Sequence, residues 1–384
     1  MKCPACNQPC EDVFFRSPEL PASCNVLHRT RPEALLAPRG RIELACCGDC
    51  GLIWNVAFDA SRMRYAAGYE NALHFSGRYR QYSRSQARRL VDRHGLAGGR
   101  AVEIGCGDGY YLSLLREMGM GQAVGFDPSA RGGRGAAPGV RIVPRHFRPS
   151  DARKPMDLLC CRQVLEHLPQ PGRFLRDLRA AMDGHRDTVL FFEVPNACWT
   201  LEHKGIWDII YEHFTYFTPQ SLRRLFHRCG FAVVSARPAY GGQFITLTAR
   251  PGAEHPAPGG PADGRHHRLI RSFDATYRRQ VRLWRQRLAE FSRARKRLVL
   301  WGAGSKGVTF LNTMNVSPTV APFVVDVNPR KHGCYVAGAG QRVIAPDALR
   351  EYRPEVVILT NPVYRREVAE SLRRLGVDAR LLQT

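Results

Sequence analysis

Residues 207–217 gather side chains that could move a proton. The segment reads Trp-Asp-Ile-Ile-Tyr-Glu-His-Phe-Thr-Tyr-Phe, so Tyr211, Glu212 and His213 are consecutive. An imidazole titrates near neutral pH, and a neighbouring carboxylate can hold the ring in the tautomer that accepts a proton. An aromatic segment that fills a core around one hydrogen-bonded histidine has the same composition. The spacing alone therefore leaves a catalytic base and a packed core segment equally open.

A glycine-rich loop between an apolar strand at 101–104 and a helical stretch at 110–118 is typical of a cofactor site. Glycine lets the backbone approach a ligand closely and adopt positive φ. Asp127 ends the next predicted strand, where a carboxylate can accept hydrogen bonds from ribose hydroxyl groups. A dehydrogenase-type dinucleotide site and a purely structural turn are the alternatives. The loop residues that we expect to bind a nucleoside cofactor are Glu103, Gly105, Gly107, Asp108 and Gly109.

A second loop of this kind lies in the last third of the chain. It also follows an apolar strand, and Asp326 ends the strand after it. Its motif residues, which we expect to contact the substrate, are Gly302, Gly304, Lys306 and Gly307. Its lysine, Lys306, has the charge to face a phosphate group. The alternative is a half-domain that packs and orients the substrate without a nucleotide, and a second complete redox cofactor is not expected.

The first 50 residues contain seven of the 13 cysteines, which predicts a small metal module. Two Cys-x-x-Cys pairs supply four thiolates, the ligand set of structural zinc. The expected ligands are Cys3, Cys6, Cys47 and Cys50. Cys46 is the rival of Cys47 but does not reproduce the spacing of the first pair, and Cys10 and Cys24 are expected to be thiols without a metal. With four sulfur ligands the ion has no open position, so its role is structural.

The elements around these motifs predict an α/β protein of several domains, since 384 residues exceed one ordinary core of about 150 residues. A lead-in helix precedes an alternation of short apolar strands and helical stretches, the signature of a parallel sheet. A Pro- and Gly-rich stretch then separates a long amphipathic helix and a second α/β unit. The predicted parts are a zinc-binding module (1–60), a cofactor-binding domain (61–250), a linker (251–266) and a C-terminal Rossmann-like domain with its lead-in helix (267–384).

The composition limits the partners and the compartment. The formal net charge is +23, but the basic residues are spread over the whole chain, so nucleic acid is not the expected partner. The sequence has no run of about 18 apolar residues that could span a membrane. It begins without the basic and apolar regions of a secretory signal, so we expect a cytoplasmic protein with reduced cysteines.

Several motifs together resemble one enzyme family. The Glu-x-Gly-x-Gly-x-Gly loop resembles motif I of class I methyltransferases, and Val164-Leu-x-His167 resembles their fourth motif. With the cysteine module, the Tyr-Glu-His-x-x-Tyr-Phe segment and the Gly-Ala-x-x-Lys-Gly loop, nearly the whole chain resembles the sugar-nucleotide C-methyltransferases of deoxysugar biosynthesis. The resemblance implies S-adenosylmethionine as cofactor. It also implies a class I methyltransferase Rossmann-like sheet between a small four-cysteine zinc module and a C-terminal Rossmann-like domain.

The resemblance also implies an acceptor and a mechanism. In that family a ketone-bearing, nucleotide-linked deoxysugar is deprotonated beside its carbonyl, and the enolate carbon attacks the sulfonium methyl group. A histidine is the base, which matches His213. Gln163 stands where these enzymes often carry Asn, and we expect it to contact the cofactor. The residues implied for catalysis are His213, Glu212, Tyr211, His167 and Tyr69.

Two other acceptor classes stay open. The segment 360–364 differs from the usual Trp-Asn motif of the family, so a relative that tailors another small natural product fits as well. An RNA-modifying methyltransferase with a zinc-containing nucleic-acid-binding module would explain the charge and the cysteines. It would need a basic tract interleaved with aromatic residues and an Asn-Pro-Pro-aromatic motif, whereas Glu193-Val-Pro-Asn196 stands there instead.

Overall fold

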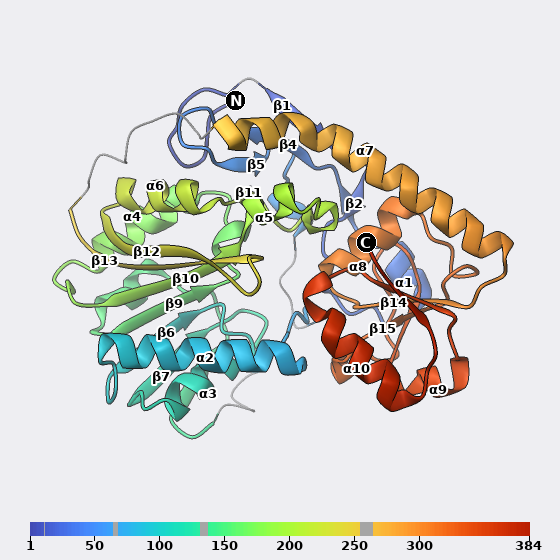
Figure 1. Cartoon of the computed structure of the whole chain (residues 1–384). Helices are drawn as coiled ribbons and strands as arrows, with labels where there is room; N and C mark the ends of the chain where they lie inside the picture. The colour runs from blue at the N-terminus through green and yellow to red at the C-terminus, as the bar shows by residue number, and fades with distance from the viewer. Residues whose placement is uncertain (11, 64–67, 131–136, 254–263) are drawn as a thin grey trace.

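The computed structural model describes residues 1–10, 12–63, 68–130, 137–253 and 264–384. They form a small N-terminal module, a central α/β domain and a C-terminal α/β domain (Figure 1). The predicted α/β class is confirmed. Most of the linker expected at 251–266 lies outside the described residues, because 254–263 are not among them. No helix in the described ranges has both the length and the apolar character needed to cross a bilayer.

The central domain is built on a seven-stranded sheet. Its strands are β6 (Arg100–Ile104), β7 (Gln122–Phe126), β8 (Val140–Val143), β9 (Leu158–Arg162), β10 (Val189–Pro195), β12 (Phe231–Ala239) and β13 (Phe244–Pro251). The order is β12-β13-β10-β9-β6-β7-β8. The five strands from β6 to β10 are parallel, and β13 and β12 add an antiparallel edge. The order reverses between β6 and β9, and ligands of such sheets bind at the carboxyl ends of the strands at that point.

Helices cover both faces of this sheet (Figure 1). They are α2 (Gly77–His94), α3 (Tyr110–Glu117), α4 (Pro171–Ala181) and α6 (Pro219–Arg228), whereas α5 (Ala197–Glu202) packs its buried side chains in the apolar cluster of the N-terminal module. Side chains of α4 and α6 share one apolar cluster with Leu159 and Cys161 of β9. Those of α2 and α3 share another with Leu158 and Cys160. Burial on both faces explains why this strand reads as a continuous apolar run instead of an alternating one.

The C-terminal domain has a parallel sheet in the order β16-β15-β14-β17-β18. Its elements are β14 (Leu298–Trp301), α8 (Ser305–Met314), β15 (Phe323–Val325), β16 (Arg342–Ile344), α9 (Leu349–Tyr352), β17 (Val356–Leu359), α10 (Arg365–Leu375) and β18 (Arg380–Gln383). Short 3₁₀ helices of the chain are η1 (Ala60–Arg62), η2 (Pro149–Arg153), η3 (Leu165–His167), η4 (Ile206–Asp208), η5 (Pro329–Lys331), η6 (Pro346–Ala348) and η7 (Pro362–Tyr364).

The long helix α7 (Gly264–Arg293) connects the parts of the molecule. It runs from the N-terminal module to the C-terminal domain in Figure 1. Its buried residues Phe273, Tyr277, Val281 and Trp284 recur every three or four positions, which is the stripe expected of an amphipathic helix. They belong to one apolar cluster with residues of the module and of the C-terminal domain.

The N-terminal module is not a separate body, because its sheet includes a strand from the central domain. Its elements are β1 (Val13–Arg16), β2 (Leu20–Pro21), α1 (Arg31–Leu35), β3 (Arg39–Gly40), β4 (Glu43–Cys46) and β5 (Ile53–Asn55). The sheet order β1-β4-β5-β11 ends on β11 (Thr215–Tyr216). Thr215 pairs with Trp54 and Tyr216 with Ile53. The module therefore positions the backbone that directly follows His213.

Candidate active site

The glycine loop after β6 is held by Asp127. Gly105 and Gly107 have positive φ values of 70° and 55°. A Cβ atom on Gly105 would lie 2.3 Å from Cγ2 of Val164, whereas one on Gly107 would meet no atom within 4 Å. The amide of Gly107 donates to Oδ2 of Asp127 at 2.8 Å, and the Ser129 hydroxyl donates to Oδ1 at 2.6 Å. The loop thus leaves open space at Gly107, beside the carboxylate expected to bind ribose, which fits a nucleoside cofactor.

A buried charge network adjoins this loop. Arg162, at the end of β9, lies 3.7 Å from Glu103 and 3.4 Å from Glu193, and donates to the Tyr79 hydroxyl at 2.8 Å. Burial raises the pKa of Glu103 to about 7, and the charge of Arg162 opposes this rise. Gln163 has a φ of 55° and donates to Glu193 at 3.3 Å. Arg162 and Glu193 were not predicted as site residues from the sequence. The pattern that could have indicated them is a charged residue in an otherwise apolar strand.

The C-terminal domain reaches the same loop. Arg330, in η5, donates to Asp108 at 2.8 Å and to Glu70 at 3.3 Å. Nε2 of His74 lies 3.6 Å from the same oxygen of Asp108. Asp108 therefore stands both in the cofactor motif and in a contact between the domains, and this contact fixes the C-terminal domain beside the predicted cofactor site.

Four of the five predicted catalytic residues come together. The Tyr69 hydroxyl donates to Oε2 of Glu212 at 2.6 Å, and the amide of Cys24 donates to Oε1. Nδ1 of His167 contacts the backbone oxygen of Glu212 at 2.8 Å. The rings of His167 and His213 have centroids 5.0 Å apart and planes at 72°. One polar cluster thus brings together His167 of η3, Glu212 and His213 before β11, and Tyr69.

The fifth, Tyr211, is held apart from this cluster. Its hydroxyl accepts from the amide of Asp59 at 2.8 Å and contacts the backbone oxygen of Asp59 at 3.3 Å. Its ring stacks on Phe58 with a centroid distance of 5.3 Å and is 1% exposed. Tyr216 is instead the tyrosine whose ring lies next to His213, at 5.8 Å. In this structure Tyr211 serves the packing of the module against the central domain.

Both histidines are uncharged at neutral pH. Burial is the main cause that holds the pKa of His213 well below its usual value, and the nearby ammonium group of Lys306 acts in the same direction. Burial likewise lowers the pKa of His167 to about 4. A neutral imidazole has a lone electron pair and can accept a proton, so the protonation state of both rings suits a base.

The second glycine loop faces the central domain. Gly302 has a φ of 107°, and the amide of Ala303 donates to Asp326 at 2.8 Å. Lys306 forms an ion pair with Asp208 of the central domain, so its ammonium group already has a carboxylate partner. A Cβ atom on Gly304 would meet no atom within 4 Å, whereas one on Gly307 would lie 2.0 Å from the backbone oxygen of Gly302.

A pocket lies between the N-terminal module and this loop. It encloses about 300 Å³, part of it open to solvent. Cys24, whose amide bonds Glu212, lines it on one side, and Ala303 and Lys331 line it on the other. Lys331 is 6% exposed and donates to the backbone oxygen of Ala303 at 3.0 Å. One lining residue, Cys24, thus bonds Glu212 through its amide, and another, Ala303, belongs to the second glycine loop.

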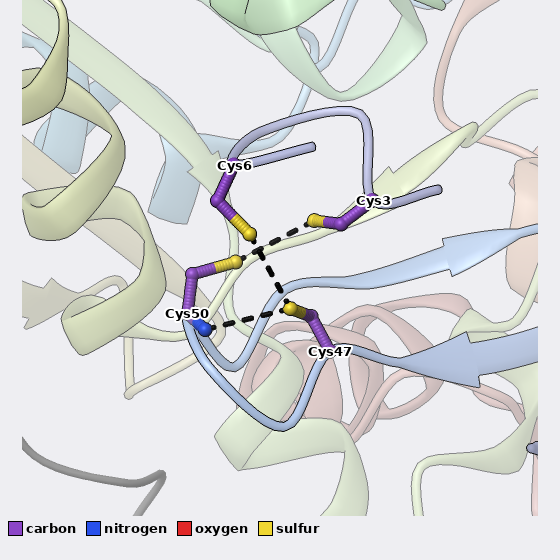
Figure 2. A group of neighbouring side chains, drawn as sticks. All are labelled: Cys3, Cys6, Cys47 and Cys50. Atoms are coloured by element: carbon purple, nitrogen blue, oxygen red, sulfur yellow. Dashed lines mark hydrogen bonds between the residues drawn. The ribbon is translucent and has the colours of Figure 1, made fainter. Parts of the chain in front are cut away.

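The four predicted cysteine ligands converge, as Figure 2 shows. They are Cys3, Cys6, Cys47 and Cys50, all buried, with their sulfur atoms within 4.8 Å of one another. Two pairs of sulfur atoms are 3.6 and 3.5 Å apart. Tetrahedral zinc with bonds of about 2.3 Å needs similar separations. Cys46 is not part of the group, and its sulfur lies 3.8 Å from His266. The donor set and its geometry fit one Zn²⁺ ion.

Comparisons with known proteins agree with this architecture. A family model described as a methyltransferase domain matches residues 77–236, and one described as a C-methyltransferase C-terminal domain matches residues 264–379. The C-methyltransferase NovU of Streptomyces niveus is 28% identical over 315 residues, which cover 76% of this chain and 73% of NovU.

Solved structures are similar to less than half of the chain. The 1,6-didemethyltoxoflavin-N1-methyltransferase of Burkholderia thailandensis has 18% identity and a TM-score of 0.33, covering 44% of this chain and 78% of that protein. The magnesium protoporphyrin IX methyltransferase of Synechocystis PCC 6803 has 18% identity and a TM-score of 0.34, covering 45% and 83%.

The two family models lie on the two α/β domains, and the relative has the same activity class as the C-terminal model. The central sheet, with its glycine loop at the reversal of strand order, lies mostly within the residues that the methyltransferase-domain model matches. The chain is therefore an S-adenosylmethionine-dependent methyltransferase, and its C-terminal domain is similar to that of C-methyltransferases.

Proposed function

We propose that this methyltransferase methylates a carbon next to the carbonyl group of a nucleotide-linked keto-deoxysugar, with His213 as the general base. The observation that carries the proposal is the cluster of Tyr69, Glu212, His167 and His213. Carbon is a poor nucleophile until a proton leaves, so a C-methyltransferase needs a base near its acceptor. A neutral histidine next to a tyrosine–carboxyl pair supports that role.

The chemistry follows from these groups. His213 takes the proton from the acceptor carbon, and the electron pair of the broken C–H bond is shared with the carbonyl oxygen as an enolate. Tyr69 would donate a hydrogen bond to that oxygen by turning its hydroxyl proton away from Glu212. S-Adenosylmethionine, held at the first glycine loop, would supply an electrophilic methyl group whose bond to sulfur breaks as the bond to carbon forms. The residues around the first glycine loop contribute mainly alignment.

The pocket and the second glycine loop support a phosphate-bearing acceptor. The loop leads into α8, whose first amides have no side-chain cap. Such a helix start binds anions through its free N–H groups and its dipole. Gly304 leaves open space there, and the buried ammonium group of Lys331 adds positive charge. Lys306 would join the site only by exchanging its ion pair with Asp208 for one with a phosphate.

The zinc ion and the domain limits are further parts of the proposal. Four buried thiols support a structural Zn²⁺ ion bound by Cys3, Cys6, Cys47 and Cys50. We also propose domain boundaries at residues 60 and 250. They divide the chain but not the sheet of the module, because β11 of the central domain belongs to that sheet. For the same reason, we expect the module and the central domain to unfold together.

The acceptor is tested with purified enzyme, S-adenosylmethionine and a panel of keto-sugar nucleotides. Mass spectrometry is expected to find a product heavier by one CH₂ group, with the new carbon bonded to carbon by NMR. Matched sugar nucleotides without the ketone are expected to stay unmodified, because they form no enolate. The sugar assignment fails if only keto compounds without a nucleotide are methylated, and the carbon assignment fails if the methyl group is found on oxygen or nitrogen.

Replacing Asp127 with Ala is expected to weaken S-adenosylmethionine binding by about 10- to 100-fold, because the change removes a charged acceptor for ribose and releases the amide of Gly107. Isothermal titration calorimetry measures the change in Kd. Asp183→Ala, on an exposed turn after α4, is the matched control and should bind the cofactor normally. Unchanged affinity of Asp127→Ala would remove this residue from the cofactor site.

A further inference from the structure

Glu166 is a buried carboxyl group beside the two histidines, and the proposed mechanism does not use it. It lies in η3, directly before His167, and is 1% exposed. Neither side-chain oxygen forms a hydrogen bond with another residue in the described part of the chain. A buried carboxyl group without a partner is costly in a native fold, and such groups concentrate at functional sites.

This carboxyl group lies close to both rings. Oε1 of Glu166 is 4.0 Å from Nε2 of His167, and one potential ligand atom from each of Glu166, His167 and His213 lies within 4.8 Å of the others. Nδ1 of His167 contacts the backbone oxygen of Glu212, which can only accept. Nδ1 therefore carries the proton, and Nε2 of the neutral ring keeps its electron pair on the side of Glu166. Nδ1 of His213 is buried and has no hydrogen-bond partner among the described residues.

Glu212, the carboxylate that follows from the sequence as the partner of His213, is engaged elsewhere. One of its oxygens accepts from Tyr69 and the other from the amide of Cys24. Its contact with the histidine pair is made by its backbone oxygen. The side-chain carboxyl group that lies with the two rings is that of Glu166.

We propose that Glu166 is the positioning residue of the base: as a carboxylate it balances the imidazolium charge that forms on the His167–His213 pair when His213 takes the proton. The inference rests on the proposed function of His213. In the step concerned, the C–H electron pair becomes part of the enolate and the proton bonds to His213, so no oxidant or reductant takes part. A positive charge formed in buried surroundings is unfavourable unless a counter-charge is near.

The surroundings of Glu166 set the pH at which it ionises. Cys161 on β9 and Glu193 on β10 lie on its sheet side, and the two histidines lie in η3 and before β11. Lys306 of α8 acts on His213. Burial is the main cause that raises the pKa of Glu166 to about 8. The carboxyl group holds its proton below that pH and loses it above, so turnover is expected to rise with pH through about 8.

The test compares Glu166→Gln, which keeps the size but cannot ionise, with Glu166→Asp, which keeps the carboxyl group. Glu166→Gln is expected to lower kcat by about 10- to 100-fold, to leave S-adenosylmethionine binding unchanged and to lose the rise of kcat near pH 8. Glu166→Asp should regain part of the rate and keep a rise with pH. In ¹⁵N NMR of histidine-labelled enzyme, recorded without acceptor, the shift change that ionisation of Glu166 causes in the two rings near pH 8 should vanish in Glu166→Gln.

The NMR measurement separates this inference from the acceptor assignment. If the rings of Glu166→Gln show the same shift change as in the wild-type enzyme, the positioning role is overturned, whatever the acceptor proves to be. If the shift change is lost but the wild-type enzyme methylates no keto sugar, the positioning role is supported and the proposed acceptor fails. A second metal ion per wild-type chain that Glu166→Gln loses would overturn the inference, because the three residues would then be a metal site.

Discussion

Replacing His213 with Ala is expected to lower kcat by about 10²- to 10⁴-fold, the range that removal of a general base gives, and to leave S-adenosylmethionine binding unchanged. The physical reason is that the acceptor carbon becomes a nucleophile only after its proton leaves. His213 belongs to the histidine pair, whereas the cofactor is expected at the loop around Gly107. Single-turnover kinetics measures the first effect, and calorimetry with the cofactor alone measures the second.

His203→Ala is the matched control for this variant. His203 stacks on Trp199 at 5.1 Å, and its Nδ1 contacts the backbone oxygen of Trp199 at 3.1 Å. It is an exposed histidine at the end of α5 and should tolerate the change with full turnover. Loss of cofactor binding in His213→Ala would contradict the assignment, because the histidine would then serve the cofactor site or the fold. Full turnover of His213→Ala would exclude it as the base.

The fold was predictable wherever local patterns determine it. The glycine loops follow from glycine conformation, and the buried strands and the stripe of α7 follow from apolar periodicity. Both signals lie within a few consecutive residues, so the sequence displays them directly. The shared sheet of the module was not predictable. β11 contains only two residues, and its pairing with β5 joins positions far apart in the chain. No periodicity within a two-residue strand indicates its partner.

In the candidate site, too, the sequence predicted the residues better than their contacts. The consecutive residues Glu212 and His213 suggest a direct partnership, but Glu212 turns to Tyr69, and Glu166 lies beside the rings instead. Neighbours in sequence outside a helix point in different directions, so adjacency does not decide contact. Tyr211 shows this too, because its hydroxyl bonds the backbone of Asp59. Partners of a buried group are set by tertiary packing, which the sequence motif does not encode.

Removing the proposed zinc ion is expected to destabilise the enzyme and to abolish turnover together. Cys47→Ser should lose the metal and lower the Tm by roughly 10 °C or more, since structural zinc sites contribute several kcal/mol to folding. Turnover should fall with it because β5, which follows the second cysteine pair, pairs with β11, which begins two residues after His213. Elemental analysis, thermal unfolding and the methylation assay measure the three effects on one preparation.

Cys46→Ser provides the control, since it changes the adjacent thiol and leaves the four converging sulfur atoms intact. It should keep one zinc ion per chain, the Tm and the turnover. If Cys46→Ser also loses the metal, the ligand set is wrong. If Cys47→Ser loses zinc and stability but its residual folded fraction turns over at the full rate, the module supports folding without positioning His213. The link from metal through β5 and β11 to the base would then be broken, and the role of the module would be confined to the stability of the chain.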